Sequence, residues 1–322
     1  MLNFPILSEN KRGTDAFPSC FFMKNSKFVS RHGNYRKNTT INYTSMRKII
    51  LLATMLLAMV ATNVYAQAEN VTIDGDHGKL HAVIHKPALK QGERCPMVLL
   101  CHGFMGNKEG ALEKQIASLL QAKGIASIRF DFNGHGQSEG RFQDMTVPNE
   151  IVDAKRVIEY VSRLPYVESV AIAGHSQGGV VAAMTAGDLG AERIKAVVLL
   201  APAAVLRDDA IRGSTMGATY DPFNLGEYVE LFRGLKLGAE YIRTAFSLPI
   251  YETAAKYQGP ALIIHGTGDR VVPYTYGERF HKEWPKSELV IIEKADHGFS
   301  KEIEQVAGRS AEFLSKVLLS NR

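Results

Sequence analysis

A single serine stands among closely spaced glycines in the stretch GHSQGG, residues 174–179. A run of small apolar residues typical of a buried strand precedes it, and an apolar helical pattern follows it. Ser176 therefore fits the G-x-S-x-G turn from strand to helix, which exposes a nucleophilic hydroxyl. The alternative is a glycine-rich turn with an incidental serine, because so short a motif also occurs by chance.

A serine hydroxyl is a poor nucleophile unless a base takes its proton and a third group orients that base. Two histidines, His281 and His297, follow both the serine and the candidate acids. His281 lies inside a predicted helix. His297 follows a predicted strand, at the end where open α/β sheets carry their active sites. We predict that His297 is the base and that Asp269, which also follows a strand, is the acid.

Ester or amide hydrolysis also needs donors for the oxyanion of the tetrahedral intermediate. We expect one backbone N–H from Gln177, the residue after the nucleophile, and a second from Phe104 in the loop after the strand "VLLCHG". His102 precedes the serine and is interpreted as a brace for this loop. His175 and His265 receive the same structural interpretation.

Strands and helices alternate along the chain after an entry hairpin at 70–86. Continuous apolar strands that alternate with helices indicate a mostly parallel central sheet covered on both faces, an α/β fold. A long stretch from about 203 to 250 interrupts the alternation and is rich in glycines and aromatic residues. We interpret it as an inserted lid within one domain. Strands are expected at 96–103, 126–132, 167–174, 194–202, 259–266 and 287–296, with helices at 108–124, 147–164 and 177–189.

The chain before residue 67 has the pattern of a targeting segment. Residues 46–66 combine a basic start, a short apolar run and small residues before Ala66, the layout of a cleaved signal peptide. The apolar run is short for a membrane span, so no stable membrane insertion is expected after cleavage. Residues 1–45 show no periodicity, and we interpret them as a non-native N-terminal extension. The domain is then 67–322, and the protein is secreted or periplasmic.

The charge balance argues against a nucleic-acid partner. Residues 1–66 carry nine of the 38 Lys/Arg and two of the 33 Asp/Glu, which leaves 29 basic and 31 acidic residues in 67–322. The basic excess therefore belongs to the leader and not to the domain. The glycine-rich turn at 131–140 lacks the spacing of a phosphate-binding loop, and no residue cluster has metal-ligand spacing. We expect no metal or other cofactor.

If Cys95 and Cys101, the cysteines of the domain, lie on one extended strand, they are too far apart for a disulfide. Six residues along a strand span about 20 Å, whereas a disulfide needs Cα atoms within about 7 Å. We therefore expect no bridge between them.

The sequence resembles the α/β-hydrolase superfamily over about 70–320. The resemblance rests on "HGF" at 102–104, "GHSQGG" at 174–179, Asp269 and His297. Within the superfamily, "HGFMGNK", "DFNGHGQSEG", "LLAPAA" and the stretch "LGAEYIRTAFSLPIYE" are similar to the bacterial cinnamoyl (feruloyl) esterases. In that group the lid contacts the phenolic end of the substrate, which implies substrate contacts for Asp209 and Tyr241. Met216 stands where relatives carry a polar residue.

The resemblance implies a secreted serine esterase that acts on hydroxycinnamoyl esters of plant cell-wall sugars, with a small-molecule or oligosaccharide ester as its partner. A short-chain carboxylesterase and a serine peptidase of the same fold are alternatives. An acyltransferase would use the same residues, and a catalytically inactive binding protein would not need all three.

Overall fold

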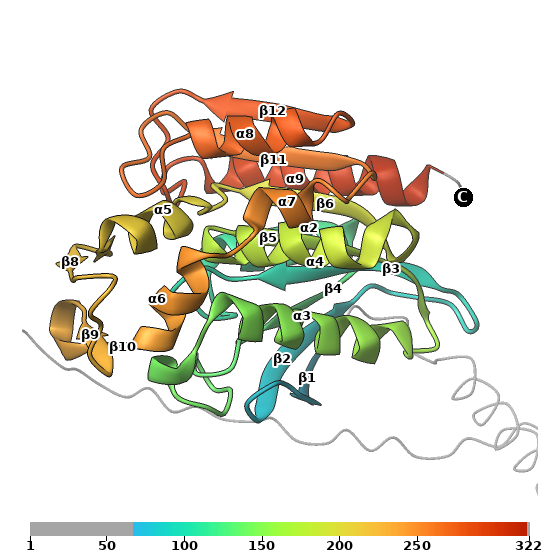
Figure 1. The fold of residues 1–322 in the computed structure, drawn as a ribbon. Coiled ribbons are helices and arrows are strands. Elements are labelled where there is room, and N and C mark those ends of the chain that lie inside the picture. Colours follow the sequence, from blue (N-terminus) through green and yellow to red (C-terminus); the bar gives the residue numbers. More distant parts are fainter. Residues whose placement is uncertain (1–66, 321–322) are drawn as a thin grey trace, which may run out of the picture. The chain divides into compact units, whose positions relative to one another are not determined.

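The computed structural model describes residues 67–320 (Figure 1). The expected N-terminal extension at 1–45 and the signal peptide at 46–66 lie outside the described residues, as do residues 321–322. Both therefore stay predictions from sequence.

The centre of the fold is one eight-stranded sheet in the order β1-β2-β4-β3-β5-β6-β11-β12. The first two strands form an antiparallel hairpin, and β2 also pairs antiparallel with β4. All pairs from β4 to β12 are parallel, which confirms the expected α/β fold with a mostly parallel sheet. The strands are β1 (Gln67–Asp74), β2 (Lys79–Lys86), β3 (Cys95–Cys101), β4 (Ala126–Phe130), β5 (Val167–His175), β6 (Ile194–Leu200), β11 (Ala261–Gly266) and β12 (Ser287–Ile292).

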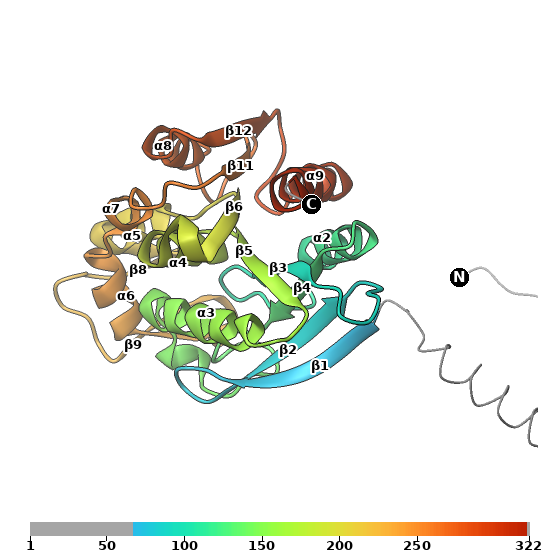
Figure 2. The ribbon, with the colours of Figure 1, turned by 90° about the vertical axis from the view of Figure 1, so that its right-hand side faces the viewer.

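Helices cover both faces of the sheet, as Figure 2 shows. One face carries α2 (Ala111–Ala122) and α9 (Ile303–Leu319), which pack on each other. The opposite face carries α3 (Val147–Ser162) and α4 (Gln177–Arg193), with α7 (Ile250–Ala254) against α4 and α8 (Thr275–Glu283) against α7.

Two hydrophobic cores result from this layering. Side chains of a strand alternate between the faces of a sheet, so neighbouring residues enter different cores. Leu99 and Ile172 pack in the core under α3 and α4, whereas Val98 and Ala171 pack in the core under α2 and α9. All seven residues of β3 are buried. Burial on both faces explains why the central strands are continuous apolar runs in the sequence.

The chain between β6 and β11 forms several short elements beyond the carboxyl end of β6, on the left of Figure 1. This segment contains the range expected to be a lid. Its two small antiparallel pairs were not predicted from the sequence. Its elements before α7 are α5 (Val205–Arg212), β7 (Ser214–Thr215), β8 (Ala218–Thr219), β9 (Tyr228–Glu230), β10 (Lys236–Gly238) and α6 (Ala239–Phe246).

Candidate active site

Ser176 occupies a sharp turn between β5 and α4. Its backbone has φ 55° and ψ −123°, a strained conformation for a residue with a side chain. The flanking glycines make this turn possible. A Cβ at Gly174 would lie 2.0 Å from the Gly178 carbonyl oxygen, and a Cβ at Gly178 would lie 2.4 Å from the Cys101 carbonyl oxygen. The Ser176 N–H donates to the Leu200 carbonyl, which fixes the turn to β6.

The structure brings Ser176, His297 and Asp269 together from the ends of three different strands. His297 Nε2 lies 2.9 Å from Ser176 Oγ, and His297 Nδ1 lies 2.7 Å from Asp269 Oδ2. Because an ionised carboxylate only accepts hydrogen bonds, Nδ1 carries the imidazole proton. Nε2 is then free to accept the proton of the serine hydroxyl. This is the arrangement that a serine nucleophile requires.

Asp269 accepts four hydrogen bonds. Its Oδ1 accepts from the N–H groups of Val271 and Val272, both at 2.8 Å. Its Oδ2 accepts from His297 and from His265 Nε2, the latter at 3.2 Å. Burial alone would raise the pKa of Asp269, but the hydrogen bonds from His265 and His297 hold it well below its usual value. The acid is therefore ionised at neutral pH.

His265 is more than a brace for its loop. Its ring is fully buried, and Nε2 also lies 3.0 Å from the Val272 carbonyl oxygen. Its contact with the acid was not predicted from the sequence. The available signal was its position four residues before Asp269, at the end of the same strand.

His175 and His102 hold the loops on either side of the serine. His175 Nε2 lies 2.8 Å from the backbone oxygen of His297, and burial lowers the pKa of His175 to about 4. His102 Nδ1 donates to the Gly103 carbonyl at 2.9 Å, and its Nε2 accepts from the Phe132 N–H at 3.1 Å. Burial lowers the pKa of His102 to about 3.

The two expected oxyanion donors come from different parts of the chain, the start of α4 and the loop after β3. Gln177 is the first residue of α4, so its N–H has no partner within the helix. Phe104 follows Gly103, where a Cβ would come 2.8 Å from the Ser176 Cβ. Within residues 67–320 neither N–H makes a hydrogen bond.

The Gln177 side chain joins a buried chain of polar groups behind the serine. Its Oε1 accepts from the Tyr241 hydroxyl at 2.7 Å, and its Nε2 donates to Glu150 Oε2 at 2.8 Å. All three residues are buried, and burial raises the pKa of Glu150 well above its usual value. Glu150 was not predicted from the sequence, because it lies on the buried face of α3 and belongs to no recognisable motif.

Two residues that the family resemblance assigned to the substrate lie outside the cavity at the serine. Tyr241 is buried, only 3% exposed, because α6 directs its hydroxyl to Gln177 and not into the cavity. Asp209 on α5 is half-buried and pairs with Arg212. Burial raises the pKa of Asp209, although Arg212 opposes this rise. Met216 does line the cavity.

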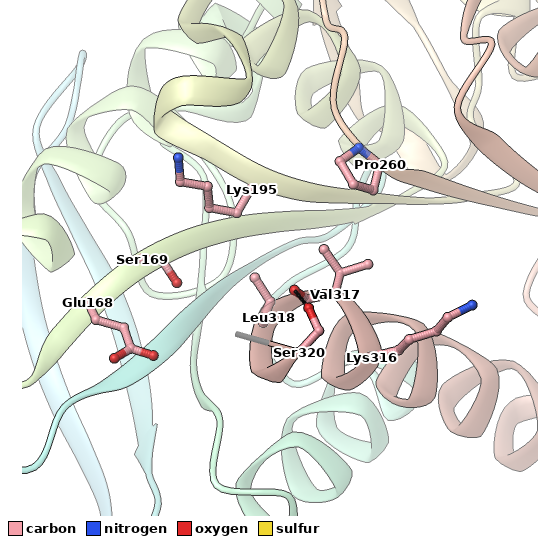
Figure 3. A pocket seen from close by; sticks show the side chains of 8 residues that line it. All are labelled: Glu168, Ser169, Lys195, Pro260, Lys316, Val317, Leu318 and Ser320. Atoms are coloured by element: carbon pink, nitrogen blue, oxygen red, sulfur yellow. Dashed lines mark hydrogen bonds between the residues drawn. The ribbon is translucent and has the colours of Figure 1, made fainter. Parts of the chain in front are cut away.

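A cavity of about 480 Å³ opens at Ser176. The loop at 102–110 forms much of its wall, together with Glu113, Met216, Val271 and His297. A larger hollow of about 770 Å³ lies at the amino ends of β5, β6 and β11 (Figure 3). Its wall includes Lys195, Pro260 and Lys316. None of Ser176, Asp269 and His297 lines it. The chemistry therefore points to the smaller cavity.

The described part of the chain, residues 67–320, has no cluster of three His, Cys, Asp or Glu residues that could hold a metal ion. None of the helices in that range is long and apolar enough to cross a membrane.

Comparison with known proteins identifies the family. Residues 92–219 match the family model described as serine aminopeptidase, S33, and residues 242–318 match that of TAP-like protein. The structure of Est1E from Butyrivibrio proteoclasticus with bound ferulic acid is 32% identical, with a TM-score of 0.73, over 77% of this chain and 99% of that one. A human serine hydrolase is 27% identical over 67% of this chain and 79% of its own length. The chain belongs to the α/β-hydrolase superfamily, among its serine hydrolases of the esterase type.

Proposed function

We propose that the protein hydrolyses hydroxycinnamoyl (feruloyl) esters of plant cell-wall sugars, with Ser176 as the nucleophile. The observation that carries the proposal is the hydrogen-bonded series Ser176–His297–Asp269 in a chain 32% identical to an esterase that binds ferulic acid.

In the first step His297 Nε2 takes the hydroxyl proton while Ser176 Oγ attacks the ester carbonyl carbon. The N–H groups of Phe104 and Gln177 hold the oxyanion, and each such donor contributes about 10² to 10³ in rate. Asp269 stabilises the imidazolium that forms. The C–O bond to the alcohol then breaks, and the alcohol leaves with the proton from His297.

In the second step water replaces the alcohol. His297 takes a proton from the water, and the resulting hydroxide attacks the acyl-enzyme carbonyl. The ester bond to Ser176 breaks, Ser176 Oγ recovers its proton from His297, and the free acid departs. The sum is one ester and one water converted to one acid and one alcohol.

Aromatic side chains beside the oxyanion loop support an aromatic acyl group. The Phe104 ring is half-buried and lies 5.3 Å from the Phe142 ring and 5.7 Å from the Tyr241 ring, measured between centroids. Aromatic rings gain from such edge contacts beyond the burial of their area. We propose that the segment between β6 and β11 is the lid and that Asp209 on it receives the phenolic hydroxyl. Tyr241 then acts through Gln177.

The proposed site of action is outside the cytoplasm. The signal-peptide pattern at 46–66 supports secretion or export to the periplasm. A polymeric or oligomeric ester would be met in that compartment.

A serine peptidase is the second candidate, because residues 92–219 match a family model of serine aminopeptidases. The same triad cleaves amides, so the leaving group and the acyl group decide between the two functions.

Turnover of four substrates by the purified protein separates the candidates: methyl ferulate, methyl p-coumarate, methyl hexanoate and an aminoacyl anilide. We expect kcat/KM for the two hydroxycinnamates to exceed that for the hexanoate by about tenfold or more, equivalent to about 1.4 kcal/mol. p-Nitrophenyl acetate serves as the control for an active enzyme. A preference for the anilide, or equal rates on aromatic and aliphatic esters, contradicts the feruloyl proposal.

A further inference from the structure

A buried carboxyl group lines the cavity at Ser176 and takes no part in the mechanism above. Glu113 lies in the first turn of α2 and is 8% exposed. It forms part of the wall of the 480 Å³ cavity, together with Ser176 and His297. The small hollow beneath it is lined mainly by apolar residues, Leu100, Ile116 and Leu200 among them.

The Glu113 carboxyl has no partner on another residue. Its only hydrogen bond is to its own backbone N–H, and no other residue of 67–320 bonds or pairs with it. Burial raises its pKa, and the helix N–H and Arg129 oppose that rise. A carboxyl group has acceptor sites beyond the one that this bond uses, and burial without further partners costs free energy. A cavity-lining position allows a ligand to supply a further partner.

The cavity at Ser176 borders the base that protonates the leaving group. His297 protonates the leaving oxygen, so that oxygen lies within reach of His297 Nε2. His297 and Val271, two residues beyond Asp269, both line the cavity, and so does Glu113. Tyr241 and Asp209, from the segment between β6 and β11, do not line it.

We propose that Glu113 forms a subsite for a hydroxyl group of the leaving alcohol, which makes a sugar the preferred alcohol over methanol. The inference rests on the proposed ester hydrolysis and deepens it by naming the residue that recognises the sugar. It does not depend on the identity of the acid. A hydroxyl both donates and accepts, so it pairs with Glu113 in either protonation state.

An ammonium ligand, as in an aminopeptidase, fits this wall less well. Arg129 brings a positive charge to the same region, where its Nη1 lies 3.6 Å from Glu109 Oε1. Glu109 is also paired with Lys114 at 2.7 Å. Two cations beside the two acids leave no net negative charge to attract an ammonium group.

The competing explanation is structural, because an acid in the first turn of a helix stabilises the helix dipole. The test therefore varies the alcohol and the residue together. The substrates are methyl ferulate, feruloyl arabinose, and feruloyl arabinose with its remaining hydroxyls methylated. The variants are Glu113→Leu and Glu113→Gln, with Glu304→Leu as the control, because Glu304 is an acid in the first turn of α9.

We expect Glu113→Leu to lower kcat/KM for feruloyl arabinose about tenfold and to change that for methyl ferulate less than about twofold, the effect of about one lost hydrogen bond. Glu113→Gln should retain most of the sugar preference, and Glu304→Leu all of it. For the wild-type enzyme, kcat/KM for methylated feruloyl arabinose should be about tenfold lower than for feruloyl arabinose. Where Glu113→Leu does not fold, this measurement still tests whether the sugar hydroxyls are recognised, and Glu113→Gln tests the residue.

Equal losses on the sugar and methyl esters in Glu113→Leu would assign the residue a structural role and overturn the subsite. Equal kcat/KM of the wild-type enzyme for feruloyl arabinose and for its methylated form would overturn the subsite as well. If no ferulate is hydrolysed, the feruloyl proposal fails separately. The same comparison then uses ethyl acetate and acetylated arabinose.

Discussion

His265 Nε2–H donates to the same Asp269 oxygen, Oδ2, that accepts the hydrogen bond from His297 Nδ1–H. The acid is thus held between two imidazoles, one that faces the serine and one that is fully buried. Two backbone N–H groups hold its other oxygen. The carboxylate therefore has little freedom to turn away from His297, which keeps the base in its working tautomer.

We expect Ser176→Ala to lower kcat for every ester by about 10⁴-fold or more, because the nucleophile is lost and only binding and oxyanion stabilisation remain. The fold should survive, since alanine fills less space at the turn. Steady-state kinetics and thermal unfolding check both statements. Ser162→Ala is the matched control: its hydroxyl donates to the Ile158 carbonyl on α3 and should be dispensable for activity.

His265→Leu should lower kcat about tenfold and leave KM nearly unchanged, because the acid loses one donor but the substrate contacts stay. His265→Gln, which retains a donor, should recover part of the rate. Steady-state kinetics of both variants on one ester measures kcat and KM separately. A change in KM alone, or a leucine variant as fast as the wild type, would show that His265 does not position Asp269.

Tyr241→Phe removes the hydroxyl that donates to Gln177 Oε1 and leaves the ring in place. A buried acceptor without its donor costs about 1–3 kcal/mol, so the unfolding free energy should fall by that order. We expect a lower kcat and an unchanged KM for both methyl ferulate and methyl cinnamate, which lacks the phenol. A loss confined to methyl ferulate would instead return Tyr241 to the substrate.

The buried His102 predicts a loss of stability in acid. Burial lowers the pKa of His102 to about 3, and the nearby His135 adds to this effect, so the folded state resists protonation of a ring whose Nε2 accepts from the Phe132 N–H. The unfolded chain, with a histidine pKa near 6.5, binds more protons between these values. Stability from this group is therefore full above pH 6.5 and falls by about 1.4 kcal/mol per pH unit toward pH 3.

Urea unfolding of the wild type and of His102→Gln at pH 7 and pH 5 measures this contribution. Between these values the wild type should lose about 2 kcal/mol more than the variant. Equal losses in the two proteins would show that His102 titrates normally in the folded state. Because both proteins share every other acid and base, the difference isolates this histidine.

Much of the fold was predictable from the sequence because the central strands are buried on both faces. Continuous apolar runs such as β3 and β6 predict a parallel sheet. The glycines around Ser176 predict the sharp turn at the end of β5. The same logic selected Asp269 and His297 from the ends of β11 and β12. Positions at the ends of parallel strands converge in space whatever their separation in the chain.

The side-chain networks behind the site were not predictable in this way. Tyr241, Gln177 and Glu150 come from three helices whose relative placement no local pattern encodes. Their polar groups meet only because α3, α4 and α6 pack together. The family resemblance implied a substrate contact for Tyr241, whereas its hydroxyl donates to Gln177. A resemblance identifies a matching position in the chain but does not specify the direction of its side chain. The short strand pairs at 214–238 were missed because they are too short for any periodicity.

The segment between β6 and β11 leaves and re-enters the sheet through neighbouring strands. The Ala201 N–H donates to the Ile264 carbonyl, and the Val197 N–H donates to the Pro260 carbonyl. Both ends of the segment are therefore held where β6 and β11 pair. Two hydrogen bonds among residues 67–320 link this segment to the turn at Ser176: the Ala203 N–H donates to the Ser176 carbonyl, and the Tyr241 hydroxyl donates to Gln177 Oε1. Exchange of the segment for a relative's would therefore change the substrate range on the same catalytic residues, provided that both hydrogen bonds are kept.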